Sequence, residues 1–169
     1  MSYFAVATTR IGDTWEAAEV DLDDVDDLDE VLDRLRDIDP DADTALLFVE
    51  ADDEYLVILR LDNGDDLRVF GSDAPFAEES RLGGILLSDT DTDVTPEPST
   101  DDDEDAEPPV TSELDVAPVG EPELLADLGV SATMLLGLCA KDGMLPSDIT
   151  AEIGTRIGCG DVLEEVHDA

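Results

Sequence analysis

The sequence has very little positive charge. Eight Lys and Arg residues stand against 47 Asp and Glu residues, so the 169-residue chain carries a formal net charge of −39. The basic residues are scattered along the chain: Arg10, Arg34, Arg36, Arg60, Arg68, Arg81, Lys141 and Arg156. A strongly negative chain repels phosphate groups unless a local basic patch opposes the repulsion. We therefore expect no direct binding to nucleic acid or to an anionic membrane surface.

Long apolar runs are also absent. No stretch approaches the roughly 20 apolar residues that a helix needs to cross a bilayer. The first residues, MSYFAVATTRIGDTW, lack the basic region followed by an apolar region that is typical of a signal peptide. The two cysteines, Cys139 and Cys159, form no C-x-x-C pair and suit free thiols in a reducing compartment. These features predict a cytoplasmic protein.

Residue types that carry catalysis or bind metals are scarce. His167 is the single histidine, and no Ser-His-Asp or Cys-His arrangement can be assembled around it. One histidine and two distant cysteines do not supply a structural zinc site. Paired carboxylates occur throughout so acidic a chain, so they carry no information about acid–base chemistry. We therefore predict no catalytic, cofactor-binding or metal-binding residues, and no cofactor.

One acidic pattern has the spacing of a calcium loop. Asp39, Asp41 and Asp43 alternate, and Glu50 follows at the twelfth place. The sixth place is Thr44, where an EF-hand loop needs glycine, and the segment TALLFVE that follows is typical of a strand. We interpret the pattern as a chance spacing and expect no rise in melting temperature that is selective for calcium over magnesium.

Two strands and a helix are predicted at the start of the chain. Residues 3–9 and 15–20 are β-prone on either side of a turn, which predicts a β-hairpin. Apolar residues from Val25 to Ile38 then recur at helical spacing. Asp27 and Glu30 stand where an N-cap residue and its partner would stand.

Three more strands are predicted from residues 44–50, 55–61 and 67–71, which are rich in strand-forming residues. Asn63-Gly64 between the last two is a strong hairpin signal. Residues 1–87 are therefore predicted to form an α+β module of order β-β-α-β-β-β, an antiparallel sheet of about five strands with one packed helix. A further helix over residues 75–87 would be interrupted by Gly83-Gly84.

The remaining chain divides into an acidic segment and a helical segment. Residues 88–119 contain the run VTPEPSTDDDEDAEPPV and are predicted to be a disordered linker, because they cannot bury enough apolar surface to offset chain entropy. Residues 120–169 predict a C-terminal cluster of short helices. The start signals of these four helices are Pro122, Ser131, Pro146 or Ser147, and Asp161 with Glu164.

Several isolated residues have structural interpretations. The aromatic residues Trp15, Phe48, Tyr55 and Phe70 fall on predicted strands, where packing is the expected role. Cys139 lies on an apolar helix stripe and is predicted to be buried, whereas Cys159 lies between two glycines and is predicted to be exposed. The glycines of IGTRIGCGD follow a helix and predict helix termination, not a phosphate-binding loop.

Taken together, several stretches resemble a known family. These stretches are FAVATTRIGDTWEAAEV, EYLVILRL with RVFGSDA, LADLGVSATMLLGLC and LPSDITAEIGTRIGCGDVLEE. They resemble the actinobacterial tRNA adenosine deaminase-associated protein family, which is named for being encoded beside the deaminase that makes inosine at the tRNA wobble position. The resemblance implies a companion of that enzyme, and it leaves open whether the two proteins bind each other or share only a gene neighbourhood. The chain lacks the H-x-E or C-x-E element and the P-C-x-x-C element with which such an enzyme holds zinc.

The expected function is that of a non-catalytic accessory protein that acts through protein–protein contacts, with tRNA adenosine deaminase as the partner. The alternative is a small-ligand-binding protein or an enzyme that uses a pocket in the N-terminal module. The acidic segment is interpreted as a tether. Two further hypotheses for the acidity stay open: that a basic partner reads the charge of the segment, or that the acidity suits a salt-rich cytoplasm.

Overall fold

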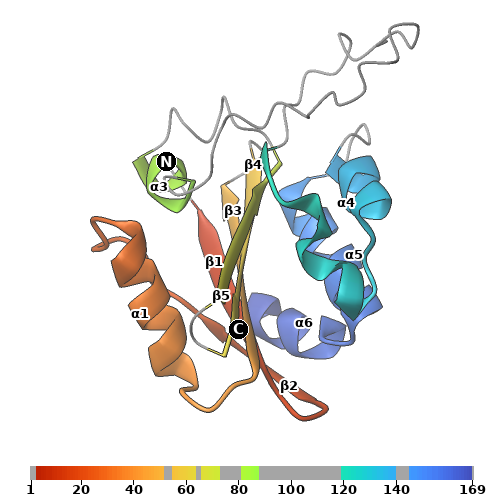
Figure 1. Ribbon diagram of the computed structural model, residues 1–169, viewed down its shortest axis with the longest axis horizontal. Helices are drawn as coiled ribbons and strands as arrows, with labels where there is room; N and C mark the ends of the chain where they lie inside the picture. The colour runs from red at the N-terminus through yellow and green to blue at the C-terminus, as the bar shows by residue number, and fades with distance from the viewer. Residues whose placement is uncertain are drawn as a thin grey trace, which may run out of the picture.

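Within the described residues, six antiparallel strands form a central sheet in the order β2-β1-β3-β4-β5-β6 (Figure 1). The computed structural model describes residues 3–51, 55–63, 66–72, 81–87, 119–139 and 145–168. The strands are β1 (Phe4–Ile11), β2 (Thr14–Glu19), β3 (Thr44–Ala51), β4 (Tyr55–Asp62), β5 (Asp66–Gly71) and β6 (Val119–Gly120). The first five confirm the predicted strands, and β6 is a strand that the sequence pattern did not indicate.

Local signals explain the first half of the sheet. Gly12, at φ +63°, makes the tight turn between β1 and β2. Both β2 and β3 pair antiparallel with β1, so the chain must cross over between them, and α1 (Leu28–Ile38) lies in this crossover. The side chain of Asp27 accepts a hydrogen bond from the Glu30 N–H at 3.0 Å, which confirms the predicted N-cap.

Helices cover both faces of the sheet (Figure 1). One face, called the α1 face, carries α1 and α3 (Arg81–Leu86). The other, called the α5 face, carries the C-terminal helices, which are η3 (Pro122–Leu128), α4 (Ala132–Cys139), α5 (Pro146–Ile157) and α6 (Gly160–Asp168). Because both faces are covered, β3 is buried along its whole length, and its sequence is a continuous apolar run with little polar alternation.

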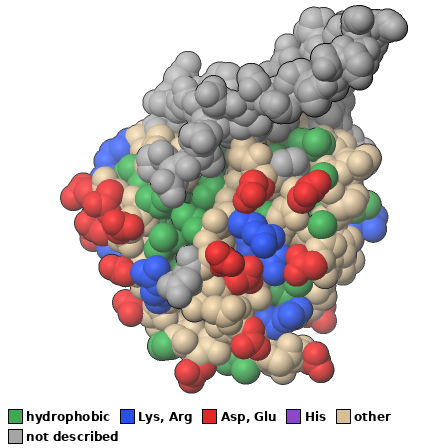
Figure 2. All heavy atoms as spheres, in the orientation of Figure 1, with side chains coloured by type: hydrophobic (Ala, Val, Ile, Leu, Met, Phe, Trp, Pro, Cys, Tyr) green, Lys and Arg blue, Asp and Glu red, His purple; other side chains and the backbone are tan. Residues whose placement is uncertain are grey.

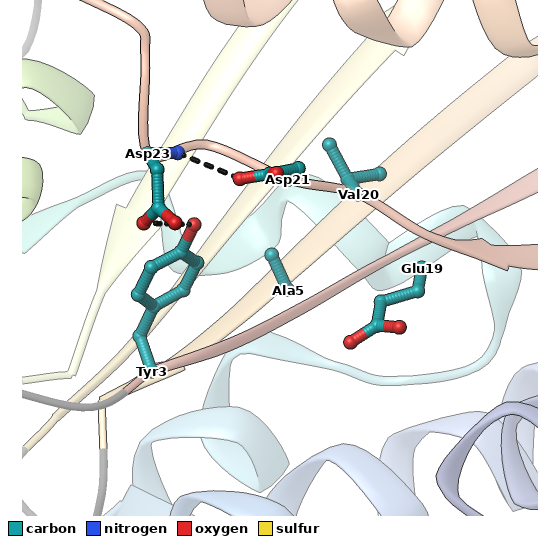
Figure 3. Close-up of a pocket in the computed structure, with 6 residues that line it drawn as sticks. All are labelled: Tyr3, Ala5, Glu19, Val20, Asp21 and Asp23. Atoms are coloured by element: carbon teal, nitrogen blue, oxygen red, sulfur yellow. Dashed lines mark hydrogen bonds between the residues drawn. The ribbon is translucent and has the colours of Figure 1, made fainter. Parts of the chain in front are cut away.

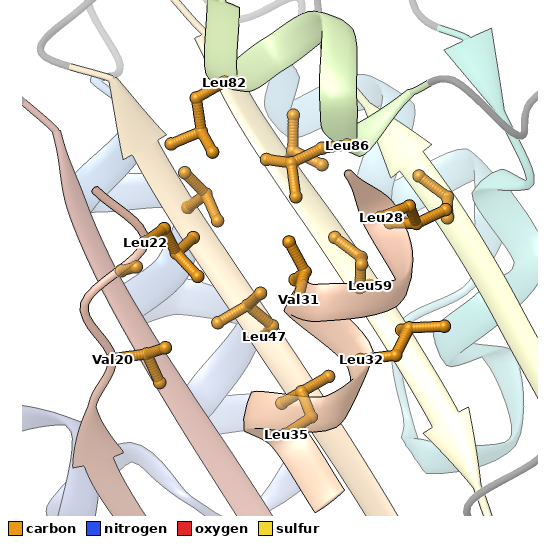
Figure 4. Close-up of a cluster of buried hydrophobic side chains, with 14 of the residues drawn as sticks. Val20, Leu22, Leu28, Val31, Leu32, Leu35, Leu47, Leu59, Leu82 and Leu86 are labelled. Atoms are coloured by element: carbon orange, nitrogen blue, oxygen red, sulfur yellow. The ribbon is translucent and has the colours of Figure 1, made fainter. Parts of the chain in front are cut away.

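Alternation along the strands divides the core into two clusters. On the α1 face, Leu47 and Leu59 from the strands meet Val31 and Leu35 from α1, with Leu86 of α3 beside them (Figure 4). On the α5 face, the alternate residues Leu46, Phe48, Leu56, Ile58 and Phe70 pack against the C-terminal helices. The aromatic residues Phe48, Tyr55 and Phe70 are fully buried, which confirms their predicted packing role.

The C-terminal helices share one core with the sheet. Leu125, Leu135, Ile153 and Leu163 come from the four different helices and are all buried on the α5 face. Each such side chain contributes roughly 1.5–3 kcal/mol when it is fully buried. The sheet therefore depends on the last third of the chain to cover its second face.

Three helices differ in detail from the prediction. The helix α3 continues through Gly83-Gly84, because burial of Leu82 and Leu86 outweighs the low helix propensity of glycine. The earlier part of that predicted helix, residues 75–80, lies outside the described residues. η3 is a 3₁₀ helix rather than an α-helix. α6 begins at Gly160, so Asp161 lies in its first turn and does not cap it.

Two other sequence features bear on the fold. The predicted linker, residues 88–119, lies outside the described residues except for Val119, which pairs with Gly71 in the sheet. The predicted turn residue Asn63 has a positive φ of 55°, as a type I′ turn requires, and Gly64 lies outside the described residues. Among the described residues, no helix has both the length and the apolar character needed to cross a membrane.

Candidate functional site

A buried arginine joins β4 to η3 on the α5 face. Arg60 is 5% exposed, because strand alternation turns its side chain toward the C-terminal helices. Its Nε donates to Asp62 Oδ1 at 3.1 Å, and Nη1 donates to the main-chain oxygen of Leu124 at 2.6 Å. Nη1 and Nη2 also donate to the two carboxylate oxygens of Asp127, at 2.6 and 2.9 Å. This bidentate geometry is the strong form of an Arg–carboxylate pair.

Arg60 and Asp127 stabilise each other's charged forms. The hydrogen bond from Arg60 is the main reason that the pKa of Asp127 lies below its usual range. The same contact raises the pKa of Arg60. Because the guanidinium is occupied by two carboxylates and a carbonyl oxygen, Arg60 acts as a structural clamp and is not available to bind a ligand.

A hollow of about 620 Å³ lies beside this clamp, between β5 and η3. Arg68, Glu121, Glu123 and Asp127 supply its polar groups, and Leu124 is among its apolar lining residues. Three carboxylates surround a single cation there. Such a charge balance disfavours an anionic ligand, and no catalytic constellation follows from these residues.

A second hollow, of about 350 Å³, lies on the α1 face around Tyr3 (Figure 3). The Tyr3 hydroxyl donates to Asp23 Oδ1 at 3.1 Å and accepts from the Leu22 N–H at 2.8 Å. Burial is the main cause that raises the pKa of Tyr3 to about 12. Tyr3 is therefore protonated at neutral pH and holds the segment that follows β2 in place.

A third hollow, of about 460 Å³, lies between the edge strand β2 and α6. Ala17, Val162 and Val166 supply its apolar lining, and its acidic lining consists of Glu16, Glu19 and Glu165. Glu19 also lines the hollow around Tyr3. The edge of the sheet at β2 is thus bordered by two acidic hollows, which the sequence interpretation did not identify.

The acidic residues of the calcium-like pattern do not converge. Asp39 ends α1, and its carboxylate accepts from the Asp41 N–H at 3.2 Å. Asp43 accepts from the Gly12 N–H at 3.2 Å. Glu50 is buried near the far end of β3, about 20 Å along the strand from Asp43. Among the described residues, no group of three or more His, Cys, Asp and Glu side chains could hold a metal ion.

The two cysteines are placed differently from their predictions. Cys159 was predicted to be exposed, but it is 1% exposed, because the corner between α5 and α6 turns its thiol toward the sheet near Thr8. Cys139 was predicted to be buried but is only partly buried at the end of α4. Burial raises the pKa of both thiols to about 12, so neither is prepared to act as a nucleophile at neutral pH.

The remaining residues discussed in the sequence analysis are the glycines near Cys159, Trp15 and His167. Gly158 caps α5 at φ +100°, which confirms helix termination, and Gly154 lies where α5 contacts Leu163 of α6. Trp15 packs against the α5-face core, with the guanidinium carbon of Arg10 5.6 Å from its ring centroid. His167 lies in the last turn of α6.

Comparison with known proteins identifies a family. The family model described as "Rv3753c-like tRNA adenosine deaminase-associated protein" matches residues 3–160. No curated protein and no solved structure matches the chain. The matched range runs from the residue before β1 to the first residue of α6. It therefore includes the sheet, α1 and α3 on one face, and η3, α4 and α5 on the other.

Proposed function

The chain belongs to the family of Rv3753c-like tRNA adenosine deaminase-associated proteins, and on that basis we propose that it is a non-catalytic partner of tRNA adenosine deaminase, which it contacts directly in the cytoplasm. The observation that carries the proposal is the family match over residues 3–160. Since the match includes the whole sheet, it supports assigning the association to the folded body and not to one short motif.

The charge of the protein supports a contact with an RNA-binding enzyme. An enzyme that binds tRNA needs a cationic surface to neutralise phosphates. A protein of net charge −39 would be drawn to such a surface by long-range attraction. Figure 2 shows carboxylate side chains spread over one face of the molecule, with the few basic side chains close to them.

The chemistry of the chain supports a non-catalytic role. The H-x-E or C-x-E and P-C-x-x-C elements of a zinc deaminase are missing from the sequence. The thiols of Cys139 and Cys159 have raised pKa values, and the Tyr3 hydroxyl is fixed by two hydrogen bonds. Arg60 is held by its carboxylate partners. The engagement of these groups within the fold supports a role for the outer surface.

The proposal is tested by mixing the purified protein with purified tRNA adenosine deaminase at moderate salt and analysing the mixture by size-exclusion chromatography. We expect the two proteins to elute as one complex, since charge attraction and a folded contact surface act together. Titration of the complex with tRNA then shows whether the protein occupies the RNA-binding face, because tRNA would displace it from that face. Separate elution at micromolar concentrations over a range of salt would overturn the proposal.

The alternative, a small-ligand-binding protein or an enzyme, has one specific observation in its favour. The hollow beside η3 contains Arg68 together with three carboxylates and a volume of about 620 Å³. A ligand for it would carry a positive group that meets the carboxylates. A thermal-shift screen of polyamines and amino-sugar compounds tests this alternative, and the Glu121→Gln/Glu123→Gln variant serves as its control. A shift that the variant abolishes would favour the ligand-binding alternative.

A further inference from the structure

The edge strand β2 has an open hydrogen-bonding side. In the described residues β2 pairs with β1 alone. The Val20 N–H donates to the Ala5 carbonyl oxygen at 2.9 Å, so this pair is hydrogen bonded. Hydrogen-bonded pairs recur at every second residue in an antiparallel ladder. It follows that Trp15, Ala17 and Glu19 turn their N–H and C=O groups away from β1.

The two sides of this edge offer space for side chains. The hollow against α6 holds about 460 Å³, and the hollow around Tyr3 holds about 350 Å³. They lie on either side of Glu19, which lines both. Successive side chains of an added strand point to opposite faces of a sheet. A strand placed along β2 would therefore direct alternate side chains into the two hollows.

The charge around the edge selects the partner. Glu16, Glu19 and Glu165 line the α6 hollow, and Asp21 and Asp23 line the Tyr3 hollow. Two described cations lie near these rims: Arg34, whose Nη1 donates to the main-chain oxygen of Asp21, and Arg10, whose guanidinium carbon lies 5.6 Å from the ring centroid of Trp15. They are outnumbered by the five carboxylates. Ala17, Val162 and Val166 offer apolar surface for the stem of a long basic side chain. The site thus combines apolar walls with excess negative charge.

We propose that the open edge of β2 is a docking site for an extended, positively charged segment of a partner protein, which adds to the sheet as a further strand. Main-chain hydrogen bonds to Trp15, Ala17 and Glu19 would provide affinity, and Arg or Lys side chains in the acidic hollows would provide selectivity. A second copy of this chain is a poor occupant, because the carboxylates of two β2 strands would face each other.

The identity of the partner as tRNA adenosine deaminase rests on the proposed function, whereas the choice of surface rests on the structure. Nucleic acid does not fit this edge, since its phosphates would meet carboxylates. A basic extended segment of the deaminase would fit. This arrangement would leave the rest of the acidic surface free of direct contact.

The first experiment measures the dissociation constant of the deaminase complex by calorimetry with full-length variants. Ala17→Pro removes an outward N–H that bonds to no described residue, and proline is tolerated on an edge strand with its nitrogen toward solvent. Glu16→Gln/Glu19→Gln/Glu165→Gln removes charge without changing shape. We expect each variant to raise the dissociation constant by about tenfold or more.

The control that removes the same number of charges is Asp66→Asn/Glu121→Gln/Glu123→Gln. These three residues are exposed carboxylates on or beside β5 and β6, at the opposite edge of the sheet from β2. We expect the control to change the dissociation constant by less than about threefold, because salt screens charges that lie far from the docking edge. If the β2 variants bind as tightly as the unsubstituted protein, the edge inference is overturned while the proposed function stands.

The second experiment follows amide hydrogen exchange in the unsubstituted protein. The N–H groups of Trp15, Ala17 and Glu19 should exchange quickly in the free protein and become protected in the complex. If the deaminase does not bind, the proposed function fails, and a short peptide of alternating Arg and Thr decides the edge inference. Protection of these three amides by that peptide, but not by a Glu-Thr peptide, would support the docking site. Unchanged exchange with the Arg-Thr peptide would overturn it.

Discussion

At the scale of single residues, Arg60 connects two elements that are far apart in the sequence. It lies in β4 and contacts Leu124 and Asp127 of η3, more than sixty positions later. A buried cation is tolerated in a core only when it is paired and hydrogen bonded. Arg60 meets this condition with Asp62 on its own strand and Asp127 on the helix. The position of η3 is therefore fixed by a polar contact in addition to its apolar ones.

Replacing Arg60 by alanine should lower the free energy of unfolding by about 3 kcal/mol. The loss stays at the lower end of the range for buried pairs because the Asp127 side chain is 61% exposed and can be solvated. Urea unfolding at neutral pH measures the change. Arg36→Ala is the control, since Arg36 pairs with Asp33 at the surface and should change stability by about 0.5 kcal/mol or less. Equal losses for the two variants would show that the clamp adds nothing.

The two cysteine thiols should react more slowly in the folded protein than in the unfolded chain. In the Cys139→Ser variant, Cys159 is the remaining thiol, and its pKa of about 12 leaves little thiolate at pH 8. We expect its reaction with an aromatic disulfide reagent to be at least about 100-fold slower in the folded protein than in urea. In Cys159→Ser, the partly buried Cys139 should react faster than Cys159 does. Labelling of folded Cys159 at the unfolded rate would contradict its burial.

Single residues also show which predictions the sequence can support. Asp27 was predicted as an N-cap because capping depends on residues three apart in the chain. The burial of Cys159 was not predicted, because it depends on how the corner between α5 and α6 packs against β1. The flanking glycines carry no information about that packing. The pair of Arg60 and Asp127 was missed for the same reason, because nothing in an acidic sequence indicates which carboxylate a distant arginine selects.

At the scale of elements, β6 is the short strand that returns the chain to the sheet after the acidic segment. Gly120 has φ +96°, and a Cβ atom at this position would lie 2.2 Å from the Val69 carbonyl oxygen. Glycine is therefore needed both for the backbone conformation and for the close approach to β5. β6 was not predicted because a two-residue strand has no periodic pattern of its own.

Gly120→Ala should destabilise the protein by about 2 kcal/mol, because it adds both a steric clash and an unfavourable φ. Gly137→Ala is the matched substitution in α4, where nothing lies within 4 Å of the added Cβ. This change should stabilise the protein by about 0.5–1 kcal/mol through helix propensity. Thermal unfolding of both variants measures the two opposite shifts. A loss of stability in Gly137→Ala would contradict the open space around this position.

The strand and helix order was predictable in large part because each signal is local. The β-prone segments of β1 and β2, the apolar runs of β3 and β4, and the Pro146 start of α5 all depend on neighbouring residues. The covering of the second sheet face by the C-terminal helices was not predictable in the same way. It depends on long-range packing across the intervening acidic residues, as does the open edge of β2.

At the scale of the whole molecule, the net charge of −39 acts on stability as well as on recognition. Like charges oppose compact structure, so screening by added salt should raise the melting temperature at first. If the acidity served a salt-rich cytoplasm, the melting temperature would continue to climb steeply into molar KCl. We expect it to level off once the Debye length falls to roughly 3 Å at 1 M salt. A continued steep rise would favour the environmental hypothesis.

Replacing the run VTPEPSTDDDEDAEPPV, residues 94–110, distinguishes two hypotheses: that the run is only a tether, or that a basic partner binds its charge. The run holds seven of the 47 acidic residues, so replacing it with a neutral Gly/Ser segment of equal length leaves most of the charge on the rest of the chain. If this run is a tether, the dissociation constant of the deaminase complex should change by less than about threefold, and its salt dependence should stay the same. Calorimetry across several salt concentrations measures both quantities.

The same titration with the Glu16→Gln/Glu19→Gln/Glu165→Gln variant provides the comparison, because those residues lie at the proposed docking edge. That variant removes three charges from one place, whereas the Gly/Ser replacement removes seven from the acidic run. A larger effect from the smaller change in charge would show that position, not total charge, governs binding. If instead the Gly/Ser replacement weakens binding about tenfold and flattens the salt dependence, the acidic run is itself read by a basic partner, and the tether interpretation is wrong.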